Sequence, residues 1–323
     1  MPHPVLAVVL AVALSGCGST AASVPPPDGP PTGSLLVQQT QPCNWLQPPD
    51  PNKCDPVGLA RIGLDGELLE ELTPELPMPM RPFALSRDGD TIAWSWNWEL
   101  AVMKLDGSPP HIINEKLTAE NLGETIFDPT WSPDGSELLY RWVGVNNEGT
   151  WYRITVDSGE LTEVPMPVEC AAMAWSPDGR QIACEVWAGD EDTGIGETDI
   201  FLVDLETLEA EALSNPGDGL SAYRPAWSPD GAWIALARQA GHGAENRDLD
   251  GIWVVNLAEG NGRQVAGGAM SMPSWSPDGN HIVAYDDDAA RLVIVGRDGS
   301  DLVQLETEPR EFVGARWLVV PQR

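Results

Sequence analysis

Trp-Ser-Pro-Asp-Gly occurs four times in this chain of 323 residues, at 131–135, 175–179, 227–231 and 275–279. A degenerate copy, Leu-Ser-Arg-Asp-Gly, precedes them at 85–89. The aspartates of successive copies lie 44 to 52 residues apart. A motif that returns at a nearly constant spacing indicates one structural unit repeated along the chain.

Each copy has the chemistry of a tight turn. Proline presets φ, aspartate can accept hydrogen bonds from the backbone ahead of it, and glycine adopts positive φ at low cost. We therefore expect three positions of the full copies to have a structural role. They are Trp131, Asp134, Gly135, Trp175, Asp178, Gly179, Trp227, Asp230, Gly231, Trp275, Asp278 and Gly279.

Short apolar segments follow the turns, as in Gln-Ile-Ala-Cys at 181–184 and Trp-Ile-Ala-Leu at 233–236. A variable loop, a second strand such as 199–205 and a last short strand complete each unit. Four short strands in about 45 residues are typical of a β-propeller blade. No long stretch has the 3.6-residue periodicity of a helical repeat.

These repeats resemble the PD40 (WD40-like) repeats of TolB-type β-propellers, and the resemblance covers residues 34–323. It implies a blade in which the tryptophan ends the innermost strand and packs between neighbouring blades. TolB proteins bind partners in a periplasmic envelope complex. The resemblance therefore implies a module that binds a protein or another ligand.

The two ends of the repeat region complete each other. Before the first motif, 35–37, 57–64 and 68–72 provide three strands, and 312–317 resembles an innermost strand. Together they make one closing blade in addition to five complete ones. The sequence thus predicts an all-β, six-bladed β-propeller whose closing blade is shared between N-terminal strands and the C-terminal strand. Closure pairs the sheet edge that the incomplete end strands would otherwise leave open.

The first residues have the pattern of an export signal. Val5 to Leu14 is an uninterrupted apolar run of ten residues, which is too short for a membrane-spanning helix and typical of a signal-peptide core. It leads into Leu-Ser-Gly-Cys at 14–17, which resembles the bacterial lipoprotein box and implies acylation of Cys17. The alternative is an ordinary secretory signal. The expected division is a signal peptide at 1–16, the lipidated cysteine and a Pro-rich tether at 17–33, and the propeller at 34–323.

Acidic residues dominate the charge. There are 18 Lys and Arg against 49 Asp and Glu, a formal net charge of −31. This balance excludes a nucleic-acid partner and electrostatic docking on anionic lipid. We expect a monomer that is exported and anchored to a bacterial membrane only through lipid on Cys17, on the periplasmic side or at the cell surface. Its partner would be an envelope or extracellular protein, or a small or polymeric ligand, and we expect no cofactor.

Four further cysteines allow disulfides, which export permits. Cys43 and Cys54 bracket a Pro-rich insertion, so a bridge between them would close a short loop. Cys170 and Cys184 flank the turn at Trp175 and could form a disulfide or remain two buried thiols. Their spacing does not resemble that of a zinc site.

An aromatic segment admits two interpretations. Trp94, Trp96 and Trp98 alternate along an extended stretch, so their indoles share one side. They could stack on a sugar or a peptide. Trp94, however, aligns with the apolar Leu236 and Ala284 of other repeats, which favours a place in the blade core.

Acidic loops also admit two interpretations. The segment 246–251, Asn-Arg-Asp-Leu-Asp-Gly, has oxygen ligands at alternate positions, like the start of a calcium loop. The segments 190–197 and 286–288 are also acidic. Solvated loops between strands explain all three, so we assign no metal site, although a calcium-dependent surface module is an alternative function.

Catalytic patterns are scarce. The four histidines, at 3, 111, 242 and 281, are scattered, and no Gly-x-Ser-x-Gly elbow occurs. We therefore assign no catalytic residues and expect a non-enzymatic protein. A propeller enzyme acting on polysaccharide or peptide is a further alternative.

The lipoprotein interpretation predicts that Cys17→Ser releases the protein from the membrane, because serine cannot carry the thioether-linked lipid. Fractionation of cells with an antibody against the propeller measures this. Cys43→Ser is the matched control and should leave the protein with the membranes. Membrane retention of the Cys17→Ser variant would contradict lipid anchoring.

Overall fold

The computed structural model describes residues 33–40, 58–73, 83–96, 99–114, 125–144, 149–187, 197–213, 220–240, 247–306 and 311–318. The expected signal peptide, Cys17 and most of the tether lie outside these residues. So do Cys43, Cys54, Trp98 and the segment 190–196.

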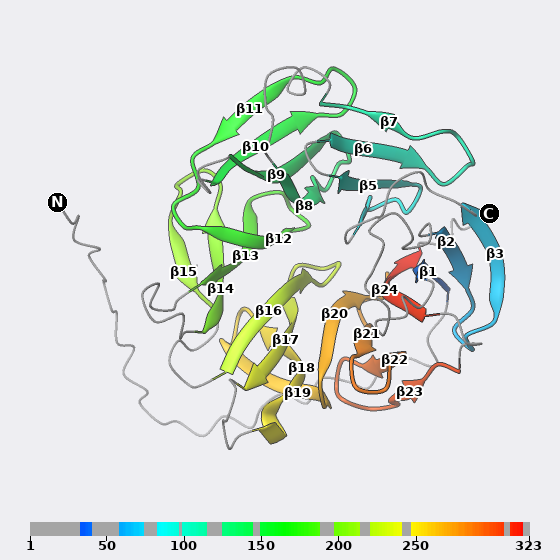
Figure 1. Cartoon of the computed structure of the whole chain (residues 1–323). Helices are drawn as coiled ribbons and strands as arrows, with labels where there is room; N and C mark the ends of the chain where they lie inside the picture. The colour runs from blue at the N-terminus through cyan, green and yellow to red at the C-terminus, as the bar shows by residue number, and fades with distance from the viewer. Residues whose placement is uncertain are drawn as a thin grey trace, which may run out of the picture.

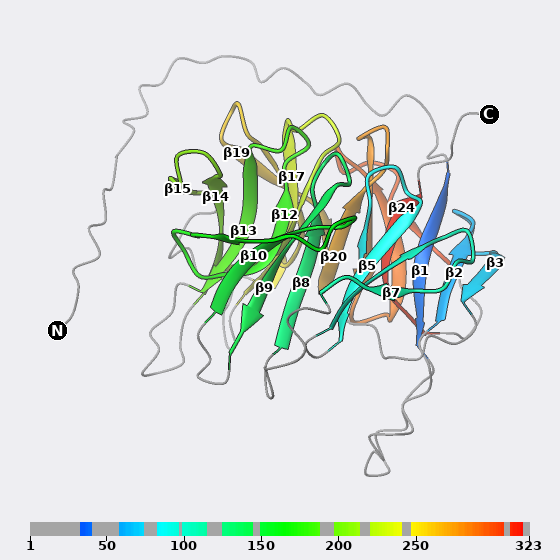
Figure 2. The ribbon, with the colours of Figure 1, turned by 90° about the horizontal axis from the view of Figure 1, so that it is seen from above.

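Six sheets of four strands each form the molecule, which confirms the all-β, six-bladed propeller. Figure 1 shows the sheets arranged around a common centre in chain order, and Figure 2 shows the ring from the side. In five of the sheets the strands follow one another in sequence order from the inner strand to the outer one. In each of these sheets a motif turn follows the inner strand. Among the described residues the one helical element is a 3-10 turn at Arg247–Leu249, and none of them forms a helix that could cross a membrane.

The strands of the five continuous blades are as follows. Blade 1 contains β4 (Ala84–Leu85), β5 (Thr91–Trp96), β6 (Glu99–Lys104) and β7 (His111–Ile112). Blade 2 contains β8 (Thr125–Trp131), β9 (Glu137–Val143), β10 (Gly149–Thr155) and β11 (Leu161–Val164). Blade 3 contains β12 (Cys170–Trp175), β13 (Gln181–Trp187), β14 (Thr198–Asp204) and β15 (Ala210–Ala212). Blade 4 contains β16 (Leu220–Trp227), β17 (Trp233–Ala240), β18 (Gly251–Asn256) and β19 (Asn261–Gly267). Blade 5 contains β20 (Met270–Trp275), β21 (His281–Asp286), β22 (Arg291–Gly296) and β23 (Val303–Gln304).

The closing blade joins the two ends of the propeller. Its strand order is β24-β1-β2-β3, with β24 at Glu311–Leu318, β1 at Ser34–Thr40, β2 at Gly58–Ile62 and β3 at Leu68–Thr73. β1 pairs antiparallel with β24, and Leu35 lies opposite Trp317. The predicted sharing of this blade is therefore confirmed.

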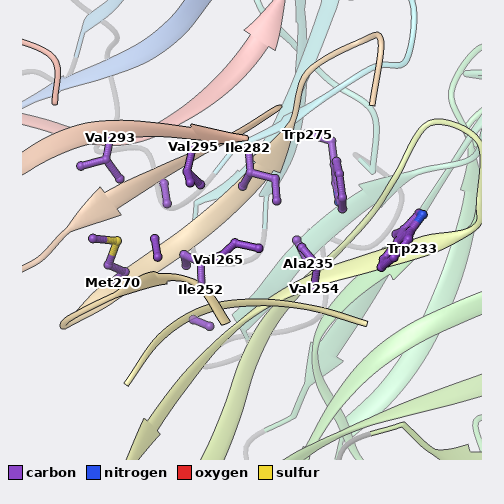
Figure 3. Close-up of a cluster of buried hydrophobic side chains, with 13 residues drawn as sticks. Trp233, Ala235, Ile252, Val254, Val265, Met270, Trp275, Ile282, Val293 and Val295 are labelled. Atoms are coloured by element: carbon purple, nitrogen blue, oxygen red, sulfur yellow. The ribbon is translucent and has the colours of Figure 1, made fainter. Parts of the chain in front are cut away.

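The hydrophobic core is divided into layers between neighbouring blades. In one layer, Ile252 and Val265 of blade 4 pack with Ile282 and Val293 of blade 5, and Met270 of the inner strand β20 belongs to the same cluster (Figure 3). Similar clusters lie at the other blade boundaries. Each sheet thus buries apolar side chains on both faces, which is the main source of its stability.

Trp94 belongs to one of these layers. Its side chain is 0% exposed and packs with Phe83, Met103 and Leu318 between blade 1 and the closing blade. The core interpretation of Trp94 is therefore correct, and its indole is unavailable for stacking on a ligand.

The closing strand gives a direct test of ring closure. Trp317 is 4% exposed in the layer between blade 5 and the closing blade, and its indole Nε1 has no hydrogen-bond partner in the described part of the chain. Trp317→Ala therefore removes packing alone, and we expect it to lower the free energy of unfolding by about 3–5 kcal/mol.

Urea unfolding followed by circular dichroism measures this loss. Trp187→Ala is the matched control, since Trp187 is 46% exposed at the end of β13. We expect the control to change stability by less than about 1 kcal/mol. Equal losses in the two variants would contradict the importance of the closing strand.

Candidate functional site

The motif turns are built around a serine–aspartate pair. In the turn at 175–179, Ser176 Oγ donates to Asp178 Oδ1 at 2.7 Å, and Asp178 Oδ1 accepts the backbone N–H of Arg180 at 3.1 Å. Ser176 Oγ also accepts the backbone N–H of Gln181 at 2.9 Å, which starts β13. Gly179 has φ of 78°, a conformation that strains any side chain.

The same network recurs in all five turns, including the degenerate one. The Ser Oγ to Asp Oδ1 distances are 2.6 Å for Ser86–Asp88, 2.7 Å for Ser132–Asp134, 2.5 Å for Ser228–Asp230 and 2.5 Å for Ser276–Asp278. The serine bond is the largest cause of the lowered carboxyl pKa of Asp88, Asp134 and Asp178. At Asp230 and Asp278 burial raises the pKa, but hydrogen bonds outweigh it and the net shift is downward.

The motif tryptophans connect neighbouring blades. Trp131 Nε1 donates to the carbonyl oxygen of Ala84 in blade 1 at 3.1 Å. Trp227 and Trp275 make the same bond to Ala174 and Ala226, each at 3.0 Å. Trp175 differs, because its Nε1 donates to Gly179 of its own turn at 3.1 Å. Each of the other three bonds fixes one inner strand against the preceding one.

The turns meet in a ring at one end of the molecule. A Cβ added to Gly179 or Gly231 would lie 3.7 Å from the ring of Pro133 or Pro177 in the preceding blade. Arg87 stands where the other copies have proline. Its Nη1 donates to the carbonyl oxygen of Pro177 at 2.8 Å, and its Nη2 lies 3.5 Å from that of Pro229. Arg87 therefore reaches from blade 1 across this end to blades 3 and 4.

A β-bulge distorts three inner strands near their middle. Asp128, Arg224 and Met272, each three residues before a motif tryptophan, have φ of 42°, 52° and 55°. Proline follows each of them, and the pairing register shifts at the same place. Proline cannot donate to the ladder, and a bulge re-aims the side chain beside it.

A central channel of about 560 Å³ runs between the inner strands. All six blades line it, through β4, β8, β12, β16, β20 and β24. Its walls are largely proline, tryptophan, serine and alanine. The charged lining residues are Arg87, Asp128, Arg224 and Arg316.

Two acidic groups engage Arg224. Arg224 Nη1 lies 3.2 Å from Asp128 Oδ1 across the channel, in an ion pair between blades 4 and 2. The backbone N–H of Arg224 donates to Glu185 Oε2 at 3.1 Å. Burial raises the pKa of Glu185, although the hydrogen bond and the charge of Arg224 oppose the shift.

Arg316 has a different environment. Its Nη1 donates to the carbonyl oxygen of Ala315 at 3.0 Å, and its guanidinium lies 5.9 Å from the ring centroid of Phe83. Among the described carboxylates none lies within ion-pair distance of Arg316. Burial, and then the charge of Arg224, lowers the pKa of the Arg316 guanidinium to about 10.

Cys170 and Cys184 form a disulfide in the structure, and both are fully buried. The bridge joins the inner strand β12 to β13 beside the channel-lining Ala172. The sequence left open a disulfide or two buried thiols, and the structure has the disulfide.

The described acidic loop residues have local hydrogen bonds. Asp250 Oδ1 accepts the backbone N–H of Ala240 at 2.6 Å and thereby closes its loop. Asp286 Oδ1 accepts the N–H of Ala289 at 2.9 Å, and Ser271 Oγ donates to Asp287 at 3.1 Å. Within the described ranges, no three or more His, Cys, Asp or Glu side chains form a group that could hold a metal ion.

Sequence reasoning identified the motif turns but not the channel charges. The signal for them was a departure from the repeat. Arg316 precedes Trp317, where the other blades have Ala84, Thr130, Ala174, Ala226 or Ser274. Arg87 likewise replaces a motif proline. A search for residues that break the repeat in the inner strands and the motif turns would have found both.

Comparisons with known proteins agree with this architecture. The family model described as "PD40: TolB beta propeller domain" matches residues 83–307. The Tol-Pal system protein TolB of Francisella tularensis subsp. holarctica (strain LVS) is 30% identical over 259 residues, which cover 65% of this chain and 56% of that protein. The uncharacterized peptidase YuxL of Bacillus subtilis is 30% identical over 174 residues, which cover 48% of this chain and 24% of YuxL. The chain thus spans about half the length of its TolB relatives.

A solved structure extends the likeness in fold. The crystal structure of TolB from Acinetobacter baumannii matches with a TM-score of 0.68 and 19% sequence identity. The match covers 88% of this chain and 66% of the other. At this identity the comparison concerns the fold.

The serine–aspartate turns predict loss of stability in acid. Each motif aspartate has a folded-state pKa below its ordinary value of 3.8. A lowered pKa contributes stability that is complete above the unfolded-state pKa and disappears as the pH falls through the folded-state pKa. We therefore expect the free energy of unfolding to fall progressively below about pH 4.

Urea unfolding at a series of pH values from 6 to 2 measures this dependence. Asp178→Asn keeps the shape of the side chain without its ionisation, so its stability should fall less steeply in acid than that of the wild type. Asp157→Asn, at an exposed position outside the motif, should leave the slope unchanged. If the Asp178→Asn curve ran parallel to the wild type, the proposed role of the motif carboxylate would be wrong.

Proposed function

The chain belongs to the PD40 family of TolB β-propeller domains, and we propose that it is an exported module that binds a protein of the bacterial envelope at the central channel. The observation that carries the proposal is the family match over residues 83–307 together with relatives named as TolB of the Tol-Pal system. The peptidase relative matches over a quarter of its length. No feature of the described residues specifically favours a propeller enzyme or a calcium-dependent surface module.

Export and lipid anchoring complete the proposal. The apolar run from Val5 to Leu14 and the Leu-Ser-Gly-Cys box that ends at Cys17 support them. The Pro-rich segment from 18 to 33 has the composition of a spacer that would hold the propeller away from the bilayer. The disulfide between Cys170 and Cys184 agrees with an oxidising compartment.

The inner strands support the channel as the contact site. At the position three residues before the motif tryptophan, the described blades have Asp128, Ala172, Arg224 and Met272. The motif turns repeat with little change, whereas this channel position differs in charge and size from blade to blade. Such variation on a regular scaffold is what specific recognition requires.

Site-specific photo-crosslinking in the native host tests the contact site. A photoreactive phenylalanine derivative at Met272, which lines the channel, should crosslink a discrete envelope protein. The same residue at Glu70, which is exposed on the outer strand β3, should not produce that adduct. Membrane fractions analysed by immunoblot and mass spectrometry provide the readout. An adduct from Glu70 alone, or none from either position, would contradict partner binding at the channel.

A further inference from the structure

The channel has the opposite charge to the rest of the molecule. The chain carries a formal net charge of −31. Yet the charged side chains that line the channel are the three arginines Arg87, Arg224 and Arg316 and one aspartate, Asp128. The cavity therefore has an excess of two positive charges in its lining.

These arginines differ in their hydrogen bonds and ion pairs. Arg87 donates to the carbonyl oxygens of Pro177 and Pro229 at the motif end. Arg224 has the ion pair with Asp128 at 3.2 Å. Among the described residues, Arg316 donates one hydrogen bond, to the carbonyl oxygen of Ala315, and has no carboxylate within ion-pair distance. It is thus the channel cation whose donors remain available.

The location of Arg316 is costly for a charge. Arg316 is half-buried on the wall of the channel, Arg224 repels its guanidinium, and its lowered pKa reflects both effects. Four of the five corresponding positions are alanine or serine and one is threonine, so Arg316 extends into space that small side chains leave open. An anion beside it would offset the cost of burying its charge.

The backbone around the site is held in an unusual conformation. Asp128, Arg224 and Met272 occupy the left-handed region, at φ of 42°, 52° and 55°. Such strained residues cluster at ligand-binding and active sites. This observation is independent of the charges.

The remaining walls define the class of ligand. Trp131, Trp175 and Trp227, with several prolines and alanines, give the channel an apolar lining. A volume of about 560 Å³ is suited to a small organic molecule. A guanidinium binds a carboxylate through two parallel hydrogen bonds.

We propose that the central channel binds a small organic carboxylate, with its anionic group on Arg316 and its apolar body against the tryptophan- and proline-lined wall. This site lies in the channel at which we place the protein partner. It requires no partner, so the isolated protein tests it, and the failure of one proposal leaves the other standing.

Isothermal titration calorimetry of the isolated protein with phenylacetate, phenylacetamide and inorganic phosphate tests the proposal. Chloride is adjusted to give equal ionic strength, because salt screens the charges of an acidic protein. We expect phenylacetate to bind at least about tenfold more tightly than the neutral amide. Equal binding of the amide, or binding of phosphate without phenylacetate, overturns the proposal.

Two substitutions with opposite expected effects locate the anion. Arg316→Met keeps the unbranched stem without the charge and should weaken phenylacetate binding about tenfold or more. Asp128→Asn removes the competing carboxylate and should strengthen binding by about threefold. Arg61→Met, which removes an exposed arginine paired with Glu70 on the outside of the closing blade, should leave the affinity unchanged.

Circular dichroism melts show whether each variant folds. If Arg316→Met does not fold, the Asp128→Asn variant decides, since asparagine also tolerates positive φ. No gain in affinity in Asp128→Asn, or an equal loss in Arg316→Met and Arg61→Met, overturns the proposal.

Discussion

The ring is held closed by backbone hydrogen bonds between β1, the first described strand, and β24, the last. Leu36 pairs with Arg316 and Leu35 with Trp317 in the same ladder. This pairing therefore positions the channel cation and fills the last interblade layer at once. Without it, blade 5 and the closing blade would each expose an apolar sheet face, and β1 an open edge. The channel is lined by a closed ring of inner strands only because these two strands meet.

Local hydrogen bonds within each turn and long-range contacts between blades both stabilise the propeller. Within a turn, Ser176 and Asp178 satisfy backbone N–H groups over five residues, so the turn is specified locally. Between blades, the bond from the Trp275 indole to Ala226 and the apolar layer of Figure 3 join strands some 50 residues apart. The motif contains both the local and the long-range element in five consecutive residues. Its repetition therefore fixes both the blade and its attachment to the previous one.

Most of the architecture follows from the sequence because its determinants are local. The turn residues, the apolar strands and the incomplete ends can each be recognised in a short stretch of sequence. Together they predicted six blades with a shared closing blade. The charged residues of the channel could not be recognised in this way. Arg87 acts on carbonyl groups of Pro177 and Pro229, 90 and 142 residues away, and the pairing becomes visible only once the ring closes. The bulges at Asp128, Arg224 and Met272 were also missed, because alternation along a strand does not reveal a positive φ.

The negative charges on the exterior and the positive charges in the channel affect an approaching anion over different distances. The net charge of −31 repels an approaching anion. At physiological salt this repulsion is largely screened beyond about 8–10 Å from the surface. In the channel, Arg224 and Arg316 both line a partly apolar wall and their charges interact, and a Coulomb interaction there is stronger than in bulk water. The acidic exterior therefore affects mainly the rate at which an anion arrives, whereas the two arginines affect how long it remains. A strongly acidic exterior is thus compatible with a channel whose lining is positively charged.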